Sequence, residues 1–376
     1  MGAKKEKHIA NTRDYGIKPK LDWDYSENGH LLVGADLVYQ DSRLEYIDMG
    51  PNPKLTRFFY KRDTGAVFFV NTNTWNNFEF SEGVRRDCTV WHNDVVEKNA
   101  LSKPRRTTWN TAWSLSAAYN YSNTGRVHTR FERGFTGLDG MIASDEVYVK
   151  QSDGTKKKVL LPTPAKDEKF DIAEIGWNDA FDWTTVSVTG WMSHTPNQIV
   201  RVLTMDNGLV RKSRNLLDVK RRGLDLKFSQ TFGPLELEEG YSYLYGKTSV
   251  KNKPGDFPPA KLNNPAYSAS GLLRVPRHKF VLTAKLNLRD NLSVEGTYLY
   301  QGSYTTAYEK EKDGSDELLK GYEVVDLALY WEPRTNIKVS AGVTNLFDKE
   351  YFQYGGGSTV VIAPGRAFFA GLKATF

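Results

Sequence analysis

The sequence predicts an all-β protein, an antiparallel β-barrel whose strands span a membrane. Fifteen segments alternate apolar and polar residues with a period of two, as strands with one apolar and one polar face do. The gaps between these segments alternate between short ones of about 2–7 residues and long ones of about 18–32 residues. Outer-membrane barrels have short turns at one end and long loops at the other, whereas a soluble sandwich has no reason for strict alternation.

The composition agrees with a barrel and excludes several other classes of protein. The chain has 376 residues and a net charge of +6, and aromatic residues make up 13% of it. Its longest apolar runs are five residues, at 66–70 and 327–331, whereas a membrane-spanning helix needs about 20. A single cysteine, Cys88, excludes an intrachain disulfide and a cysteine-based metal site. The basic residues form no nucleic-acid-binding motif, so we expect no nucleic-acid partner.

The first half of the chain contains seven predicted strands, separated by clusters of Gly, Pro, Asn and Asp. They are residues 15–25, 31–39, 64–70, 78–91, 110–121, 127–135 and 168–178. Two of them alternate poorly. Residues 78–91 contain Arg85, Arg86 and Asp87, and residues 168–178 change phase in the middle, which predicts a β-bulge.

The second half contains eight predicted strands, and the last one ends at the aromatic Phe376. They are residues 183–194, 218–232, 235–246, 278–288, 292–301, 322–331, 337–345 and 366–376. Bacterial single-chain barrels have an even number of strands. We therefore expect either a sixteenth strand within residues 4–11 or a sequence that starts inside a larger barrel.

Short motifs in the second half resemble one family. The run NLFDKEY at 345–351, followed by Pro364-Gly365-Arg366 and the last strand, resembles the C-terminal end of TonB-dependent outer-membrane receptors. Weaker matches at 132–135, 166–170, 222–226 and 275–278 follow in the same order. The resemblance covers residues 132–376, and the strand pattern extends it to residue 15.

The resemblance implies a 22-stranded barrel around an N-terminal plug, which takes up ferric siderophores, haem or cobalamin with energy from the TonB complex. We find no plug, TonB box or signal peptide in the sequence. We therefore expect residues 1–376 to form a single domain, the C-terminal 15–16 strands of such a barrel, incomplete on its own. The expected partners are a ferric siderophore or haem, TonB through a plug outside this chain, and the lipid and lipopolysaccharide of a Gram-negative-type outer membrane.

A passive porin or an adhesin barrel, neither of which needs a plug, remains an alternative. The sequence contains no GxSxG, P-loop, HExxH or CxxC motif, so we expect neither an enzyme nor a cofactor.

Six residues near the expected external strand ends are candidate ligand-binding residues: His92, His194, Tyr245, Tyr304, Arg105 and Arg106. The histidines would suit an axial haem ligand, the tyrosines would stack on a catecholate or haem, and the arginines would attract an anionic ferric chelate. Each group also has a simpler interpretation. These are a solvated histidine, an aromatic girdle at the membrane surface, and contact with lipopolysaccharide phosphates.

Overall fold

The computed structural model describes residues 6–48, 54–97, 100–102, 105–138, 144–150, 154–162, 165–206, 209–250, 275–310, 316–356 and 359–375. Strands and their connections account for these residues, and they include no helix that could cross a membrane. The predicted closing residue, Phe376, lies outside the described residues.

One large antiparallel sheet contains seventeen of the strands. They are β1 (Glu6–Ile17), β2 (Lys20–Ser26), β3 (Gly29–Asp48), β4 (Lys54–Trp75), β5 (Phe78–Glu97), β6 (Ala100–Ser102), β7 (Arg105–Asn120), β8 (Arg126–Thr136), β11 (Glu168–Phe181), β12 (Thr184–Asp206), β13 (Leu209–Phe232), β14 (Leu235–Val250), β15 (His278–Arg289), β16 (Leu292–Gln301), β19 (Tyr322–Arg334), β20 (Ile337–Thr344) and β23 (Ala367–Ala374). Three separate hairpins are β9 (Ser144–Lys150) with β10 (Lys156–Pro162), β17 (Tyr304–Lys310) with β18 (Asp316–Leu319), and β21 (Phe352–Gly356) with β22 (Thr359–Ile362).

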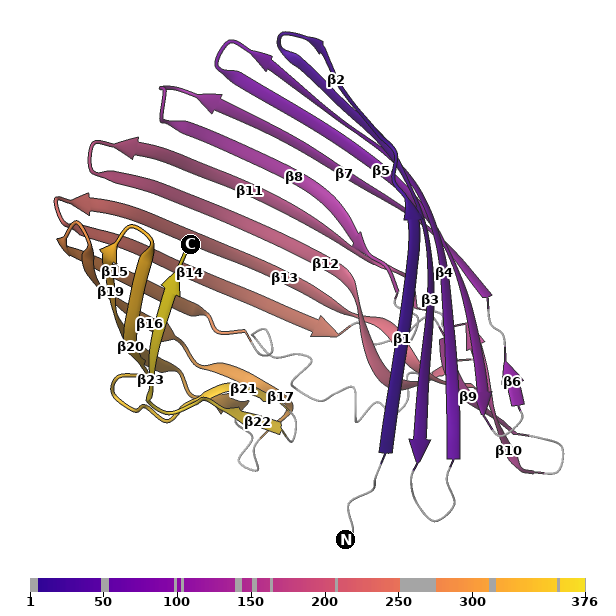
Figure 1. Cartoon of the computed structure of the whole chain (residues 1–376). Helices are drawn as coiled ribbons and strands as arrows, with labels where there is room; N and C mark the ends of the chain where they lie inside the picture. The colour runs from indigo at the N-terminus through magenta and orange to yellow at the C-terminus, as the bar shows by residue number, and fades with distance from the viewer. Residues whose placement is uncertain are drawn as a thin grey trace.

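The large sheet is a meander in which each strand pairs with its neighbours in sequence, and it forms a curved wall (Figure 1). Both β1 and β2 pair with β3, and both β6 and β7 pair with β5. The described segments therefore fill fifteen positions in the wall, which confirms the fifteen predicted strands. Strand β1 includes the described part of residues 4–11 but continues the first predicted strand, so it adds no sixteenth position.

The two ends of the wall differ as predicted. Two-residue turns join most hairpins at one end, and Asn76 and Gly233 in these turns have positive φ angles of 51° and 58°. Asn and Gly tolerate this left-handed conformation better than other residues do. We call this the short-turn end of the wall.

At the opposite end, three predicted loops are wrong, because the strands continue through most of them. Strand β3 runs to Asp48 and β4 begins at Lys54, and β12 runs to Asp206 and β13 begins at Leu209. Between the strands predicted at 78–91 and 110–121, β5 runs to Glu97, β6 is Ala100–Ser102 and β7 begins at Arg105. The physical reason is that a hairpin beyond the membrane has no apolar layer to face. Its backbone still pairs, but its side chains no longer need to alternate.

The two faces of the wall have opposite character. One face, here called the outer face, carries Leu37, Val67, Leu115 and Ile175, which are 60%, 62%, 53% and 62% exposed. The opposite, inner face carries the polar residues between them in sequence. This division is that of a membrane barrel with lipid outside and water inside.

The bulge predicted within residues 168–178 is wrong. Strand β11 pairs with both β8 and β12 without a register shift. The change of phase arises because Ile172, an apolar residue, lies on the inner face opposite Glu132 and Ser193. Register shifts do occur between β12 and β13, where Thr195 and Gln198 bound an irregular stretch.

On the inner face, several aromatic rings lie over glycines on the neighbouring strand. The directly opposed pairs are Gly34 with Phe68, Gly134 with Phe170, Gly176 with His128, Gly223 with Trp191, and Gly342 with Phe369. A Cβ atom added at any of these glycines would come within 2.6 Å of its partner ring. Glycine thus lets a large ring lie flat across the strand. The pairing of a glycine with an aromatic residue also fixes the register of the two strands.

Candidate functional site

A pocket of about 530 Å³ lies on the inner face, over β1, β3, β4, β5 and β7. Residues 135–138, at the end of β8 and just beyond it, form its rim on one side. We call this the inner pocket. Its lining is mixed, with carboxylates, guanidinium groups, threonine hydroxyls and one indole ring.

A charge network at the base of the inner pocket is internally neutralised. The Arg85 guanidinium donates hydrogen bonds from Nη1 to Asp36 Oδ2 (2.6 Å), from Nε to Asp87 Oδ1 (2.8 Å) and from Nη2 to Asp87 Oδ2 (2.9 Å). Asp87 is 6% exposed. Because bidentate arginine–carboxylate contacts fix geometry well, this network stiffens the wall below the pocket and is not free to bind an anion.

Arg62 is different, because no ion pair engages it within the described part of the chain. Its guanidinium lies 5.4 Å from the centre of the Trp91 ring, and Trp91 is 4% exposed. The Arg62 Nε and Thr108 Oγ1 atoms are buried and have no hydrogen-bond partner among the described protein atoms. A buried donor without a partner costs about 1–3 kcal/mol. Arg62 and Thr108 are therefore the groups in the inner pocket best placed to bind a ligand oxygen.

The rim of the inner pocket is held by a buried carboxylate. Asp167, 7% exposed, accepts a hydrogen bond from the backbone N–H of Leu138 (3.1 Å) and another from the amide of Asn110. Leu138 is 1% exposed. These contacts hold the segment after β8 against the inner face, where it forms one side of the inner pocket.

The structure divides the predicted ligand-binding residues between the two faces. Arg106 lies directly opposite Trp91 and therefore on the inner face beside the inner pocket. Arg105 lies directly opposite His92 on the outer face, where His92 Nε2 is 3.5 Å from Asp63 Oδ2. Tyr304 begins strand β17 of a separate hairpin and is 6% exposed.

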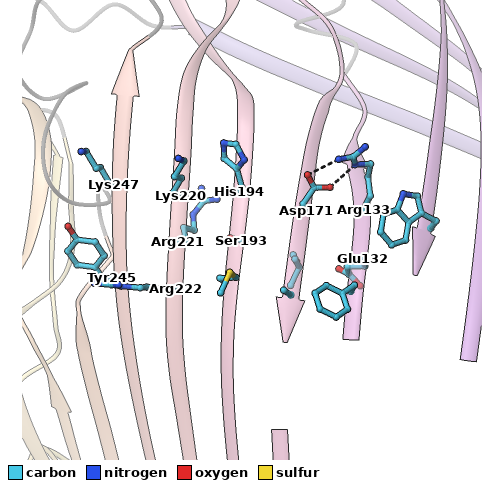
Figure 2. A pocket seen from close by; sticks show the side chains of 15 residues that line it. Glu132, Arg133, Asp171, Ser193, His194, Lys220, Arg221, Arg222, Tyr245 and Lys247 are labelled. Carbon is cyan, nitrogen blue, oxygen red and sulfur yellow. Dashed lines mark hydrogen bonds and ion pairs between the residues drawn. The ribbon is translucent and has the colours of Figure 1, made fainter. Parts of the chain in front are cut away.

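The other two candidates, His194 and Tyr245, line a second pocket that lies on the outer face (Figure 2). His194 Nε2 is 2.9 Å from Asp218 Oδ1, and the Tyr245 ring lies under the Arg222 guanidinium at 4.8 Å. The six predicted residues are therefore not brought together in one site.

Sequence reasoning missed the residues that build the inner pocket, above all Arg62, Arg85 and Asp36. A signal was present in the run of charged residues Arg85, Arg86 and Asp87, of which Arg85 and Asp87 lie on the inner face. That Arg85 reaches Asp36, and that Arg62 lies opposite Trp91, become visible only once the strand register is known.

Among the described residues, no group of three or more His, Cys, Asp or Glu side chains is arranged to hold a metal ion.

Comparison with known proteins finds one matching family and a related transporter. The family described as "TonB dependent receptor-like, beta-barrel" matches residues 5–346. The vitamin B12 transporter BtuB of Photobacterium profundum is 24% identical over 298 residues, which are 77% of this chain and 40% of that protein.

Solved structures with the same fold carry different cargoes. The ferric yersiniabactin uptake receptor FyuA of Yersinia pestis superposes with a TM-score of 0.74 at 17% identity, over 99% of this chain and 55% of its own. The copper transporter OprC gives 0.75 at 15% identity over 99% and 58%, and the ferric citrate transporter FecA gives 0.74 at 15% over 99% and 56%. This chain thus spans about half the length of these structures and two-fifths of BtuB.

Proposed function

Because the chain belongs to the TonB-dependent receptor family, we propose that it forms the greater part of the wall of an outer-membrane receptor that imports an iron complex, either a ferric siderophore or haem. The family is one of receptors and transporters rather than of enzymes, and its barrels lie in outer membranes. The named relatives carry cobalamin, ferric chelates or copper, so the choice of an iron complex rests on the inner pocket of this chain.

The observation that supports an anionic cargo is that Arg62 has no counter-ion among the described residues. The neighbouring Arg85 is neutralised by Asp36 and Asp87, whereas Arg62 has no counter-ion among the described residues and keeps a buried donor without a partner. A guanidinium of this kind, lying beside an indole ring, suits a planar or carboxylate-bearing anion. Ferric siderophores and haem both present such groups.

We further propose that residues 1–376 act as one barrel domain and that energy from TonB reaches the cargo through a plug segment outside this chain. This proposal is supported by the architecture, because the described residues form wall strands and hairpins. A plug seated against the inner face would meet the inner pocket and could compete with cargo for Arg62.

The test is growth of the source organism under iron limitation after deletion of the gene that encodes this chain. Growth on a panel of ferric siderophores and haem should fail for at least one iron source and should return with the intact gene. Deletion of TonB should abolish the same growth. Uptake that persists without TonB would instead indicate a passive porin, and unchanged growth on every iron source would reject the iron-uptake proposal.

A pair of variants tests the role of Arg62. Arg62→Gln removes the charge, and we expect an increase of about tenfold or more in the apparent Kd for the cargo, since a lost charge-assisted hydrogen bond is worth about 1.5–3 kcal/mol. Arg13→Gln, on the exposed edge strand β1, is the matched control and should leave the apparent Kd unchanged. Equal effects of the two variants would exclude the inner pocket as the cargo site.

A further inference from the structure

The outer face carries a pocket of about 740 Å³ across β7, β8, β11, β12, β13 and β14. Strand register arranges much of its lining in two adjacent rows. The row nearer the short turns is Phe131, Ala173, Met192, Arg222 and Tyr245, and the next row is Arg133, Asp171, His194, Lys220 and Lys247. Figure 2 shows His194, Lys220 and Lys247 on neighbouring strands at one end of this outer pocket.

Strand alternation places both rows on the lipid side of the wall. Met192 is 63% exposed and Phe131 is 51% exposed, and both share their face with Ile175 and Leu115. An apolar row beside a charged row therefore lies on a surface that cannot contact cargo inside the barrel.

The charged row lies close to where the hydrocarbon layer ends. Lys220 is twelve residues from Phe232 at the short turn, and Lys247 is twelve residues from Leu235. At about 3.3 Å per residue and a tilt of about 40°, both lysines lie roughly 30 Å above that turn. The apolar band of an outer-membrane barrel is about 25 Å tall, so the lysines reach the level of the lipid headgroups.

The charges in this row do not balance. Arg133 is bound by Asp171 through hydrogen bonds of 2.6 and 2.8 Å, and His194 contacts Asp218. Lys220 and Lys247 lie directly opposite each other, and neither makes an ion pair with any residue that the structure describes. Like charges directly opposite on paired strands are destabilising. An anion bound between the two lysines is attracted to both, so it replaces this repulsion with a favourable interaction.

The row below supplies a complementary apolar surface with one further cation. Arg222 lies over the Tyr245 ring at 4.8 Å, one row from Lys220 and Lys247, and Arg277 lies 5.7 Å from the centre of the same ring. Met192, Ala173 and Phe131 continue the row as an uncharged surface. The outer pocket is thus cationic where headgroups lie and apolar where acyl chains begin.

We propose that the outer pocket binds a phosphorylated lipid of the outer leaflet, with its phosphate between Lys220, Lys247 and Arg222 and an acyl chain against Met192 and Phe131. This assignment rests on the proposed function, which places the wall in an outer membrane. His194 and Tyr245, predicted above as cargo ligands, then belong to the lipid site.

The test uses the receptor purified from its own outer membrane in mild detergent and measures lipid binding by native mass spectrometry. The titrants are a phosphorylated lipid A, the same lipid after removal of its phosphates, and inorganic phosphate. The double variant Lys220→Gln/Lys247→Gln should weaken binding of the phosphorylated lipid about thirtyfold, since each basic residue near an anionic surface is worth about one kcal/mol. The control Lys227→Gln/Lys373→Gln removes the same charge from the inner face and should leave binding unchanged.

Equal affinity of the double variant and the control for phosphorylated lipid A would overturn the proposal. So would equal binding of the dephosphorylated lipid, or binding of inorganic phosphate as tight as that of the lipid. A β-rich circular dichroism spectrum verifies that each variant is folded. Iron-limited growth is measured on the same variants and should not change, so lost lipid binding with intact uptake separates this proposal from the proposed function.

Discussion

At the scale of single residues, the outer face of a strand requires apolar side chains and the inner face accepts charged ones. Leu327 shows this difference most clearly. It is 38% exposed on the outer face near the middle of β19, opposite Gly296 and Val343. Leu327→Arg places a cation in hydrocarbon, which costs about 2–4 kcal/mol at the bilayer midplane of a barrel. We expect a loss of that size in a urea titration of the full gene product in lipid bilayers.

The matched control for Leu327→Arg is Ala328→Arg. Ala328 lies on the inner face opposite Glu295, where an added cation gains a carboxylate neighbour and stays in water. Asp326 is unsuitable as a control, because its Oδ1 accepts a hydrogen bond of 2.7 Å from the Asn345 N–H. If Leu327→Arg and Ala328→Arg destabilised the protein equally, the assignment of the faces would be wrong.

The residue scale also shows what the sequence could predict. The alternation of Leu37 or Leu327 with polar neighbours was enough to assign a face, and those assignments agree with the structure. The same alternation would have placed His194 with Met192, and Tyr245 with Tyr243, on the outer face. The sequence could not predict that Lys220 opposes Lys247, or that Arg62 lies over Trp91, because both contacts depend on register between strands.

At the scale of elements, the motif that carries the family resemblance acts as a clamp between strands. Asn345, 4% exposed, donates from its side chain to the Lys349 carbonyl and accepts from the Lys349 N–H, while its backbone N–H binds Asp326 on β19. Asp348 Oδ1 accepts the N–H of Arg366, which precedes β23. The motif thus ties β19, β20 and β23 together and does not form part of either pocket.

Asn345→Ala should weaken this clamp. It removes three side-chain hydrogen bonds, two with the Lys349 backbone and a longer one of 3.4 Å to the Pro364 carbonyl. It also replaces asparagine at a φ of 51°, which other residues with a Cβ adopt at a cost of about 1–2 kcal/mol. With about 1 kcal/mol lost per hydrogen bond, we expect a destabilisation of about 3–5 kcal/mol. Urea unfolding of the full gene product in detergent measures it.

The control for Asn345→Ala is Asn336→Ala at the opposite end of β20. Asn336 also donates from its side chain to a backbone carbonyl, that of Thr375, but the contact is exposed and 3.3 Å long. Its loss should cost less than about 1 kcal/mol. A larger effect at Asn336 than at Asn345 would contradict the clamp.

The opposed glycine and aromatic residues predict a second effect at this scale. At Gly223 an added Cβ would lie 2.4 Å from the Trp191 ring, which is fixed by a hydrogen bond of 2.9 Å from its Nε1 to Asp225. Gly223→Ala should therefore cost about 1–3 kcal/mol through forced displacement of the ring. Gly240→Ala on the neighbouring strand has nothing within 4 Å of the added atom and should change stability little. Thermal unfolding followed by tryptophan fluorescence compares the two, and equal shifts would show that ring packing is not the cause.

At the scale of elements, prediction from the sequence succeeded within the membrane and failed beyond it. All fifteen wall positions were predicted, because alternation and turn residues coincide within the membrane. The extensions of β3, β4, β12 and β13 were predicted as loops, since beyond the apolar layer backbone pairing continues without an alternating sequence. The hairpins β9–β10, β17–β18 and β21–β22 were missed for the same reason.

At the scale of the whole molecule, the wall is an open sheet. Each internal position has two hydrogen-bonded neighbours, but within the described residues β23 pairs only with β20, and β1 and β2 pair only with β3. Pro19 lies at this edge, between β1 and β2, and a proline suits an edge strand because it cannot donate a ladder hydrogen bond. Both edges offer backbone groups to further strands.

The last prediction concerns residues 1–376 expressed alone behind a signal peptide. Backbone groups without partners cost several kcal/mol each in hydrocarbon, so an open fifteen-position sheet cannot remain in a bilayer with its edges bare. We expect this polypeptide to self-associate through β1–β2 and β23 or to aggregate, as measured by light scattering in detergent. We also expect no TonB-dependent growth on ferric siderophores or haem in a strain without other receptors. A monodisperse monomer that supports such growth would show that the wall closes and functions by itself. Strands supplied in trans that restore both a monodisperse species and growth would show that the two edges are the sites where the barrel is completed.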